Sequence, residues 1–176
     1  VILLLASQVM TQGMAFATRM YKESLTRSHA KQLCSTLTNV IEKELRYTTS
    51  VNADSDGTVL KYFSPTYGKT ESAFAAIDEN ENKIDGTAGG EIAVQLTAED
   101  GSRYWQKLIS SASYSSFDLK ATIQSVKLEG TTFHVILEIT DKDGKCNSQN
   151  QVDDNKYNII KQRISCNHPR IIKQIS

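Results

Sequence analysis

Hydrophobic residues in the first part of the chain recur at the spacing of an α-helix. From Met10 onward they fall three and four positions apart, and the first proline is Pro65. This is the pattern of one buried face of an amphipathic helix, and it predicts a continuous helix from Val1 to about Thr48. Gly13 is expected to permit at most a mild bend. The positions expected to pack against the rest of the protein are Leu33, Leu37, Val40, Ile41 and Leu45, and those expected on the solvent side are Glu42, Lys43, Glu44 and Arg46.

Such a helix would be longer than the diameter of a compact protein of this size. It would extend roughly 70 Å at 1.5 Å per residue, whereas a compact chain of this length is about 40 Å across. Residues 1–25 are therefore expected to protrude and residues 26–50 to pack on the rest of the protein. The protruding part is expected to expose the apolar residues Val1, Ile2, Leu3, Leu4, Leu5, Val9, Met10, Met14 and Phe16.

The first six residues are apolar on every side of the helix, so they reserve no face for water. We interpret them as the end of a longer apolar segment, which makes the protruding part a truncated membrane or assembly segment. Two alternatives stay open at this point: the start of a buried core helix, and the remnant of a signal peptide.

After Thr48 the hydrophobic pattern changes from helical to alternating, which predicts β-strands joined by turns. The late strands are the clearest, and a slip in the alternation between Phe117 and Leu128 indicates a β-bulge before a two-residue link at Glu129-Gly130. Tyr104 to Ile109 fits either a short helix or an irregular aromatic plug. The expected strands are Thr58 to Phe63, Ser72 to Ile77, Glu91 to Ala98, Phe117 to Leu128, Thr132 to Thr140 and Tyr157 to Ile164, with weak pairing of Arg170 to Ile175.

A helix followed by a meander of strands predicts the α+β class. We expect a long N-terminal helix over residues 1–50, whose C-terminal half packs on an antiparallel β-sheet, and a globular β domain over residues 51–176. The 176 residues of the whole chain suit one domain.

Charge and motifs give no sign of catalysis. The 20 basic and 20 acidic residues balance, so the chain has no basic excess for nucleic acid. It has no nucleophile elbow, phosphate-binding glycine loop or H-E-x-x-H motif. The three histidines, His29, His134 and His168, are interpreted as surface residues. We therefore expect neither an enzyme nor a cofactor.

Two groups of residues raise the question of a metal or a disulfide. Asn52, Asp54 and Asp56 place oxygen ligands at alternate positions, as the first half of an EF-hand loop does, but a turn rich in Asp and Asn explains the same letters. Cys146 and Cys166 can pair in an oxidising compartment, remain thiols, or contribute with His168 to a zinc site whose spacing matches no usual pattern. Cys34 lies on the helix stripe and is expected to be a buried thiol.

The runs Ile2 to Ala17 and Ser28 to Leu45 resemble the middle and end of the helix of type IV pilins and pseudopilins, most of all the minor pilin-like proteins of Gram-positive bacteria. The block Tyr104 to Gly144, with Phe133-His-Val-Ile-Leu-Glu-Ile, is similar to their terminal strands. The basic-Gly peptidase site of that family, followed by Phe-Thr-Leu and a Glu, is absent from this sequence, so the family's docking Glu is assigned to no residue here. The helix-breaking proline of major pilins is also absent.

The resemblance implies a structural or assembly subunit of a type IV pilus or a related secretion or competence filament, anchored in a membrane and exposed at the cell surface. Its partners would be other pilin-like subunits, reached through the N-terminal helix. The alternative is a membrane-anchored extracytoplasmic β domain that binds a ligand or surface without polymerising. A soluble binding domain on a coiled-coil stalk would need sustained heptads with matching charges, which the helix does not provide.

Overall fold

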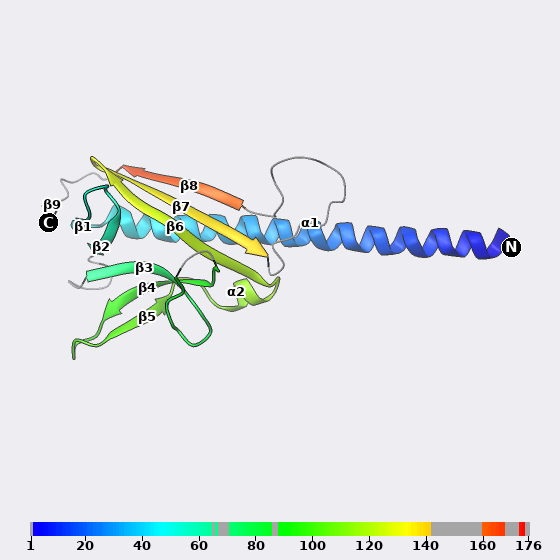
Figure 1. Ribbon diagram of the computed structural model, residues 1–176, viewed down its shortest axis with the longest axis horizontal. Coiled ribbons are helices and arrows are strands. Elements are labelled where there is room, and N and C mark those ends of the chain that lie inside the picture. The colour runs from blue at the N-terminus through cyan, green and yellow to red at the C-terminus, as the bar shows by residue number, and fades with distance from the viewer. Residues whose placement is uncertain are drawn as a thin grey trace.

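The computed structural model describes residues 2–64, 66, 71–85, 88–141, 160–167 and 173–174, and for 2–6, 160–167 and 173–174 it describes the backbone alone. One α-helix, α1 (Ile2–Arg46), runs through the molecule and projects far beyond the strands at its N-terminal end (Figure 1). The prediction of a continuous N-terminal helix is confirmed. It ends where Tyr47 and Thr48 donate their backbone N–H groups to Glu44 and Leu45, three residues back, before the first strand.

The described strands form two sheets rather than the single sheet that we expected. The larger has the order β5-β4-β3-β2-β1-β9, and the smaller has the order β6-β7-β8. Neighbours are antiparallel except β1 and β9, which run parallel. The strands are β1 (Ser50–Ala53), β2 (Val59–Phe63), β3 (Glu71–Ile77), β4 (Glu91–Thr97), β5 (Arg103–Lys107), β6 (Leu119–Glu129), β7 (Thr132–Asp141), β8 (Ile160–Asn167) and β9 (Lys173–Gln174).

The C-terminal half of α1 packs against both sheets, and together they form the head of the molecule. Leu33 and Leu37 share a core with Ile92 of β4 and Leu137 of β7. Further along α1, a second core joins the helix to both sheets in the same way; it contains Ile41, Leu45, Val51, Tyr62, Val94, Leu96, Phe133 and Val135. The helix therefore packs on the strands as its apolar stripe predicted, and it contacts both sheets, which are also bridged directly by the pairs Gly90–Ala121 and Thr58–Lys127.

Three expectations about local structure need correction. Arg103–Lys107 is the strand β5, not a helix or an aromatic plug, because it pairs along its whole length with β4. The sequence did not predict β1 or the short helix α2 (Ala112–Ser115). Glu44 was expected in water, yet it is buried, because the chain around Ser64 covers the end of α1.

The hairpin of β6 and β7 largely matches its prediction. The pairing register shifts between Ile123 and Ser125, which confirms the bulge. Strand β6 continues through Glu129, so the link is Gly130 and Thr131 rather than Glu129 and Gly130. Gly130 has φ of 62°, a conformation that glycine adopts without steric cost.

Candidate functional site

Among the described residues, the longest segment without a buried side chain is the N-terminal part of α1, and we call residues 7–29 the stem. No side chain from Ser7 to His29 is buried, and the first buried residue after them is Ala30. Large apolar side chains lie in water along the stem: the exposed fractions are 70% for Val9, 75% for Met10, 76% for Met14 and 66% for Phe16. In contrast, Leu37 in the head is fully buried.

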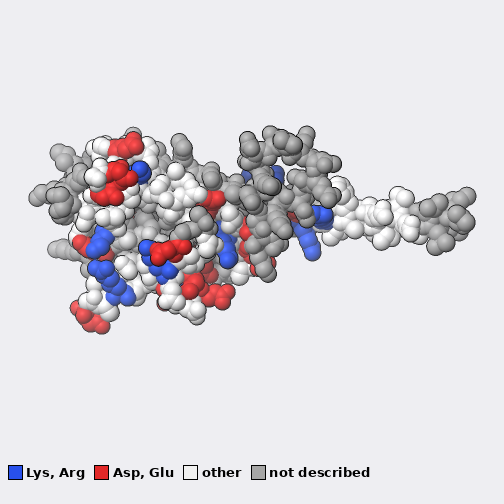
Figure 2. Space-filling model, in the orientation of Figure 1, with Lys and Arg blue, Asp and Glu red and all other residues white. Residues whose placement is uncertain are grey.

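The first half of the stem carries no charge. Arg19 is the first charged residue of the sequence, and the stem beyond it is uniformly uncharged in Figure 2. Its hydroxyl groups are satisfied within the helix: Thr11 donates to the carbonyl of Ser7 at 2.8 Å, and Thr18 donates to that of Met14 at 2.9 Å. These hydrogen bonds satisfy hydroxyl groups that would otherwise need a hydrogen-bond partner in water. The segment therefore combines exposed apolar side chains with two internally bonded threonines and the exposed amides of Gln8 and Gln12.

The structure places the predicted assembly residues as follows. Val9, Met10, Met14 and Phe16 belong to the exposed stem. Ile2, Leu3, Leu4 and Leu5 have a helical backbone, while their side chains and the whole of Val1 lie outside the described residues.

Two residues that we had not included continue the exposed surface. They are Met20, 51% exposed, and Tyr21, 66% exposed. Both residues belong to the part of the helix, residues 1–25, that we expected to protrude beyond the sheets.

The head end of α1 positions the stem. Of the residues predicted to pack on the sheets, Leu33, Leu37, Ile41 and Leu45 are buried, and Val40 is half-buried. Nearby, burial raises the pKa of the Glu44 carboxyl, although side-chain hydrogen bonds with Ser64 and Thr66 act in the opposite direction.

The turn considered for calcium uses its carboxylates within the protein. Asp54 accepts hydrogen bonds from the backbone N–H groups of Asp56 and Thr58, at 3.2 and 3.0 Å. Asp56 also accepts from Thr58 and pairs with Lys127 at 3.2 Å. Asn52 lies in β1. These contacts account for the letters of the turn, and the described part of the chain holds no group of three or more His, Cys, Asp or Glu side chains arranged for a metal.

The cysteines and histidines do not form a site among the described residues. Cys34 is buried, and this burial raises the pKa of its thiol. Cys146 and His168 lie outside the described residues, and Cys166 is placed by its backbone in β8, opposite Phe133. His29 is exposed and stacks on Phe117, with ring centroids 3.8 Å apart.

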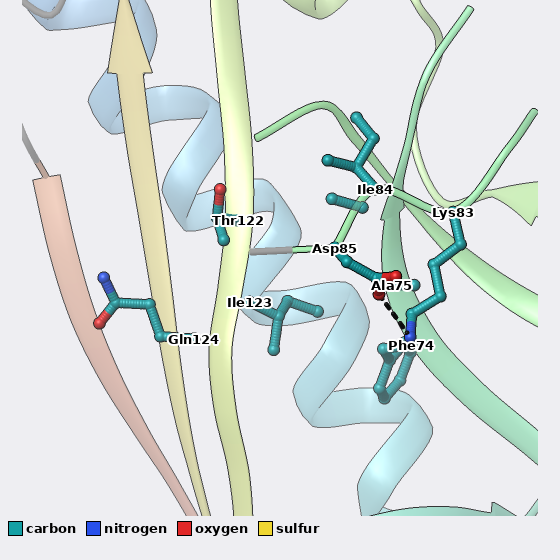
Figure 3. Close-up of a pocket in the computed structure, with 9 residues that line it drawn as sticks. Phe74, Ala75, Lys83, Ile84, Asp85, Thr122, Ile123 and Gln124 are labelled. Atoms are coloured by element: carbon teal, nitrogen blue, oxygen red, sulfur yellow. Dashed lines mark ion pairs between the residues drawn. The ribbon is translucent and has the colours of Figure 1, made fainter. Parts of the chain in front are cut away.

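Hollows on the head are a weaker candidate than the stem. The one in Figure 3, of about 470 Å³, lies where β3 and β6 face each other without pairing, and its lining includes Phe74 and Ile123. Its polar groups already have partners: Lys83 pairs with Asp85 at 3.0 Å, and Gln124 donates to Glu138. Among its described lining side chains, Thr122 offers a hydroxyl group besides these paired ones, which is little to orient a ligand.

Comparisons with protein-family models, with curated proteins and with solved structures find no match for this chain. Within the described residues, no helix has both the length and the apolar character needed to cross a bilayer. The case for function therefore depends on the geometry of the stem.

Proposed function

We propose that this chain is a non-enzymatic, pilin-like assembly subunit. Its stem is held in a membrane before assembly and then packs among the stems of like subunits in a filament. The observation that carries this proposal is the exposure of Val9, Met10, Met14 and Phe16 on a continuous helix that extends beyond the head.

Water is a poor environment for this surface. Burying a large apolar side chain stabilises a protein by roughly 1.5–3 kcal/mol relative to leaving it exposed. Four such side chains along one short segment make a continuous apolar surface, which on a soluble monomer marks an interaction site.

Two kinds of neighbour can cover an exposed apolar face of a helix: lipid and other helices. The uncharged stretch from Ile2 to Thr18 is about 25 Å long, compared with a hydrocarbon core of about 30 Å. Gly13, Ala15 and Ala17 allow close approach of a second helix, as small residues do in membrane helix pairs. The proposed function requires a stem that lies first in lipid and then among other helices.

The proposal is tested by placing charge on the stem of the complete protein. Val9→Glu and Met14→Glu should each release the protein from the membrane fraction, because a buried unpaired carboxylate is costly in lipid and between apolar helices. The matched control is Ser35→Glu, which adds the same charge to an exposed position of α1 beside the head. All three variants should keep the wild-type circular dichroism melt of the head.

A second measurement separates assembly from simple anchoring. Copies carrying Met14→Cys should form disulfide-linked dimers in the membrane when stems pack together. If Val9→Glu and Met14→Glu remain with the membrane as the wild type does, the stem is not the anchor and the proposal fails. If the stem anchors the chain but Met14→Cys copies never cross-link, the protein is an anchored β domain that does not polymerise.

A further inference from the structure

Strand β5 forms one edge of the larger sheet. It pairs with β4 on one side, and among the described residues no strand pairs with its other side. Figure 1 shows it at the margin of the head, with β4 between it and the rest of the sheet. The chain around it, residues 88–141, is described throughout. Within the described part of the chain, the outer side of β5 is therefore a free sheet edge.

The register shows which backbone groups point out of this edge. In an antiparallel pair, residues that hydrogen-bond to the neighbouring strand alternate with residues that do not. Ser102 and Leu108, on either side of β5, both form backbone hydrogen bonds across the hairpin, at 2.8 and 3.0 Å. The even-numbered residues of β5 therefore face β4. The N–H and C=O groups of Arg103, Trp105 and Lys107 point to the free edge, where they can pair with one more strand.

Two basic side chains lie on one face of this edge. Arg103 and Lys107 share that face because alternate residues of a strand lie on the same side of a sheet. Lys107 already pairs with Glu91 at 2.8 Å. Arg103 is exposed and forms no ion pair among the described residues, although Glu99 and Asp100 lie in the turn before it. The edge therefore offers one unpaired cation and a second that is shared with the sheet.

The opposite face of β5 leaves an aromatic ring uncovered. Tyr104 lies directly opposite Leu96 of β4 in the register. Leu96 is buried in the core, whereas Tyr104 is 48% exposed. Gln106, on the same face as Tyr104, is also exposed. The core thus ends at β4, and a strand added beside β5 would cover the ring of Tyr104.

Charge decides which kind of strand can be added. Basic residues on an edge strand oppose unwanted pairing. Two copies of β5 paired antiparallel over their whole length, centred on Trp105, would place Arg103 of each opposite Lys107 of the other. Like charges directly opposite each other destabilise a strand pair, whereas opposite charges stabilise it. The edge therefore disfavours a second copy of itself and favours an acidic strand.

We infer that the free edge of β5 binds an extended acidic segment of a partner protein as one more antiparallel strand. The segment carries acidic residues opposite Arg103 and Lys107 and an apolar residue opposite Tyr104. Backbone hydrogen bonds supply the affinity, and the charges select the partner. The inference goes beyond the proposed function, which concerns the stem, and does not depend on it.

A short peptide tests the inference on the complete chain in mild detergent. The probe is the heptapeptide TEVTVET, acetylated and amidated, whose two acidic residues fall opposite Arg103 and Lys107. The readout is the fluorescence of Trp105, the single tryptophan, which lies in β5 and is half-buried. Binding should shift its emission to shorter wavelength, with a Kd below about 1 mM. The matched peptide TKVTVKT should bind about fivefold more weakly or worse.

Two further comparisons test the geometry and the charge separately. N-methylation of the central threonine of TEVTVET removes an N–H that faces β5 and should weaken binding about tenfold, whereas N-methylation of either valine alters an N–H that faces away and should not. Arg103→Glu should weaken the binding of TEVTVET about fivefold and strengthen that of TKVTVKT. Lys43→Glu is the control, because Lys43 is exposed on α1 away from this edge, and it should change neither.

The outcomes separate this inference from the proposed function. If TEVTVET does not bind, or if TEVTVET and TKVTVKT bind equally, the inference is wrong and the proposed function is unaffected. If the emission of Trp105 changes with protein concentration in the absence of peptide, the occupant of the edge is a second copy and the inference is overturned. Val9→Glu chains should bind TEVTVET as the wild type does, so that failure of the stem in its own tests leaves this inference standing.

Discussion

Truncation of Leu37 to alanine measures how strongly the head depends on α1. Leu37 is fully buried and shares a core with Ile92, Leu119 and Leu137, so it joins the helix to both sheets. Removing its three terminal carbons costs about 2.4 kcal/mol in lost transfer free energy. The cavity left behind adds to this, and buried Leu→Ala changes span about 2–5 kcal/mol. We expect a loss of about 3–4 kcal/mol.

The measurement is urea unfolding of the complete chain in mild detergent, followed by far-ultraviolet circular dichroism and by the fluorescence of Trp105, the single tryptophan. The midpoint should fall while the denaturant slope stays unchanged. A thermal scan should show a drop in Tm of roughly 6–16 °C. Met14→Ala is the matched control on the same helix; because its side chain is 76% exposed, it should change stability by less than about 0.5 kcal/mol.

A loss below about 1 kcal/mol for Leu37→Ala would refute the packing of α1 described above. Equal losses for Leu37→Ala and Met14→Ala would refute the division of the helix into a packed half and an exposed half.

Three further predictions follow from single residues. Gly90→Ala would place a Cβ 2.2 Å from the backbone oxygen of Ile77, so we expect the free energy of unfolding in urea to fall by about 1–3 kcal/mol. At Gly13 an added Cβ meets no atom within 4 Å, so Gly13→Ala should stabilise the helix by about 0.5–1 kcal/mol. Equal changes in unfolding free energy for the two variants would contradict this. Because burial raises the Glu44 pKa above its ordinary value of 4.5, the stability that this group contributes is present below that pH and lost as pH rises through the raised pKa. Glu44→Gln should therefore gain on the wild type as pH rises, and a pH-independent difference in unfolding free energy would disprove it. The buried Cys34 thiol, whose pKa is raised, should react slowly with iodoacetamide until urea unfolds the head, as followed by intact mass; rapid labelling of Cys34 in the native protein would contradict its burial.

Local patterns in the sequence were sufficient for the long helix and for most strands. The spacing of three and four residues and the absence of proline predicted α1, because both act within a few residues of the chain. The alternation in β4, β6 and β7 predicted those strands in the same way, and the slip in β6 marked its bulge.

The candidate site could be predicted from the length of the helix. A helix of 45 residues exceeds the size of the head, so part of it had to leave the sheets, and the uncharged start of the chain identified which part. The sequence did not predict the hollow that Asp78 and Asp118 line. These residues are 40 positions apart, and only the approach of β3, β4 and β6 brings them together.

The sequence by itself thus determined an amphipathic helix that is longer than the head, and a set of strands to cover its C-terminal half. Only the tertiary structure decided where strand β5 forms and which residues cover the C-terminal end of α1. Strand β5 forms because β4 offers it a paired edge, although Tyr104 and Trp105 show no alternating pattern of their own. Glu44 is buried because Ser64 and Thr66, some 20 residues later, close over the end of α1 and supply hydrogen bonds. Both outcomes depend on contacts between segments that are distant in the sequence, and no local pattern along the chain specifies such contacts.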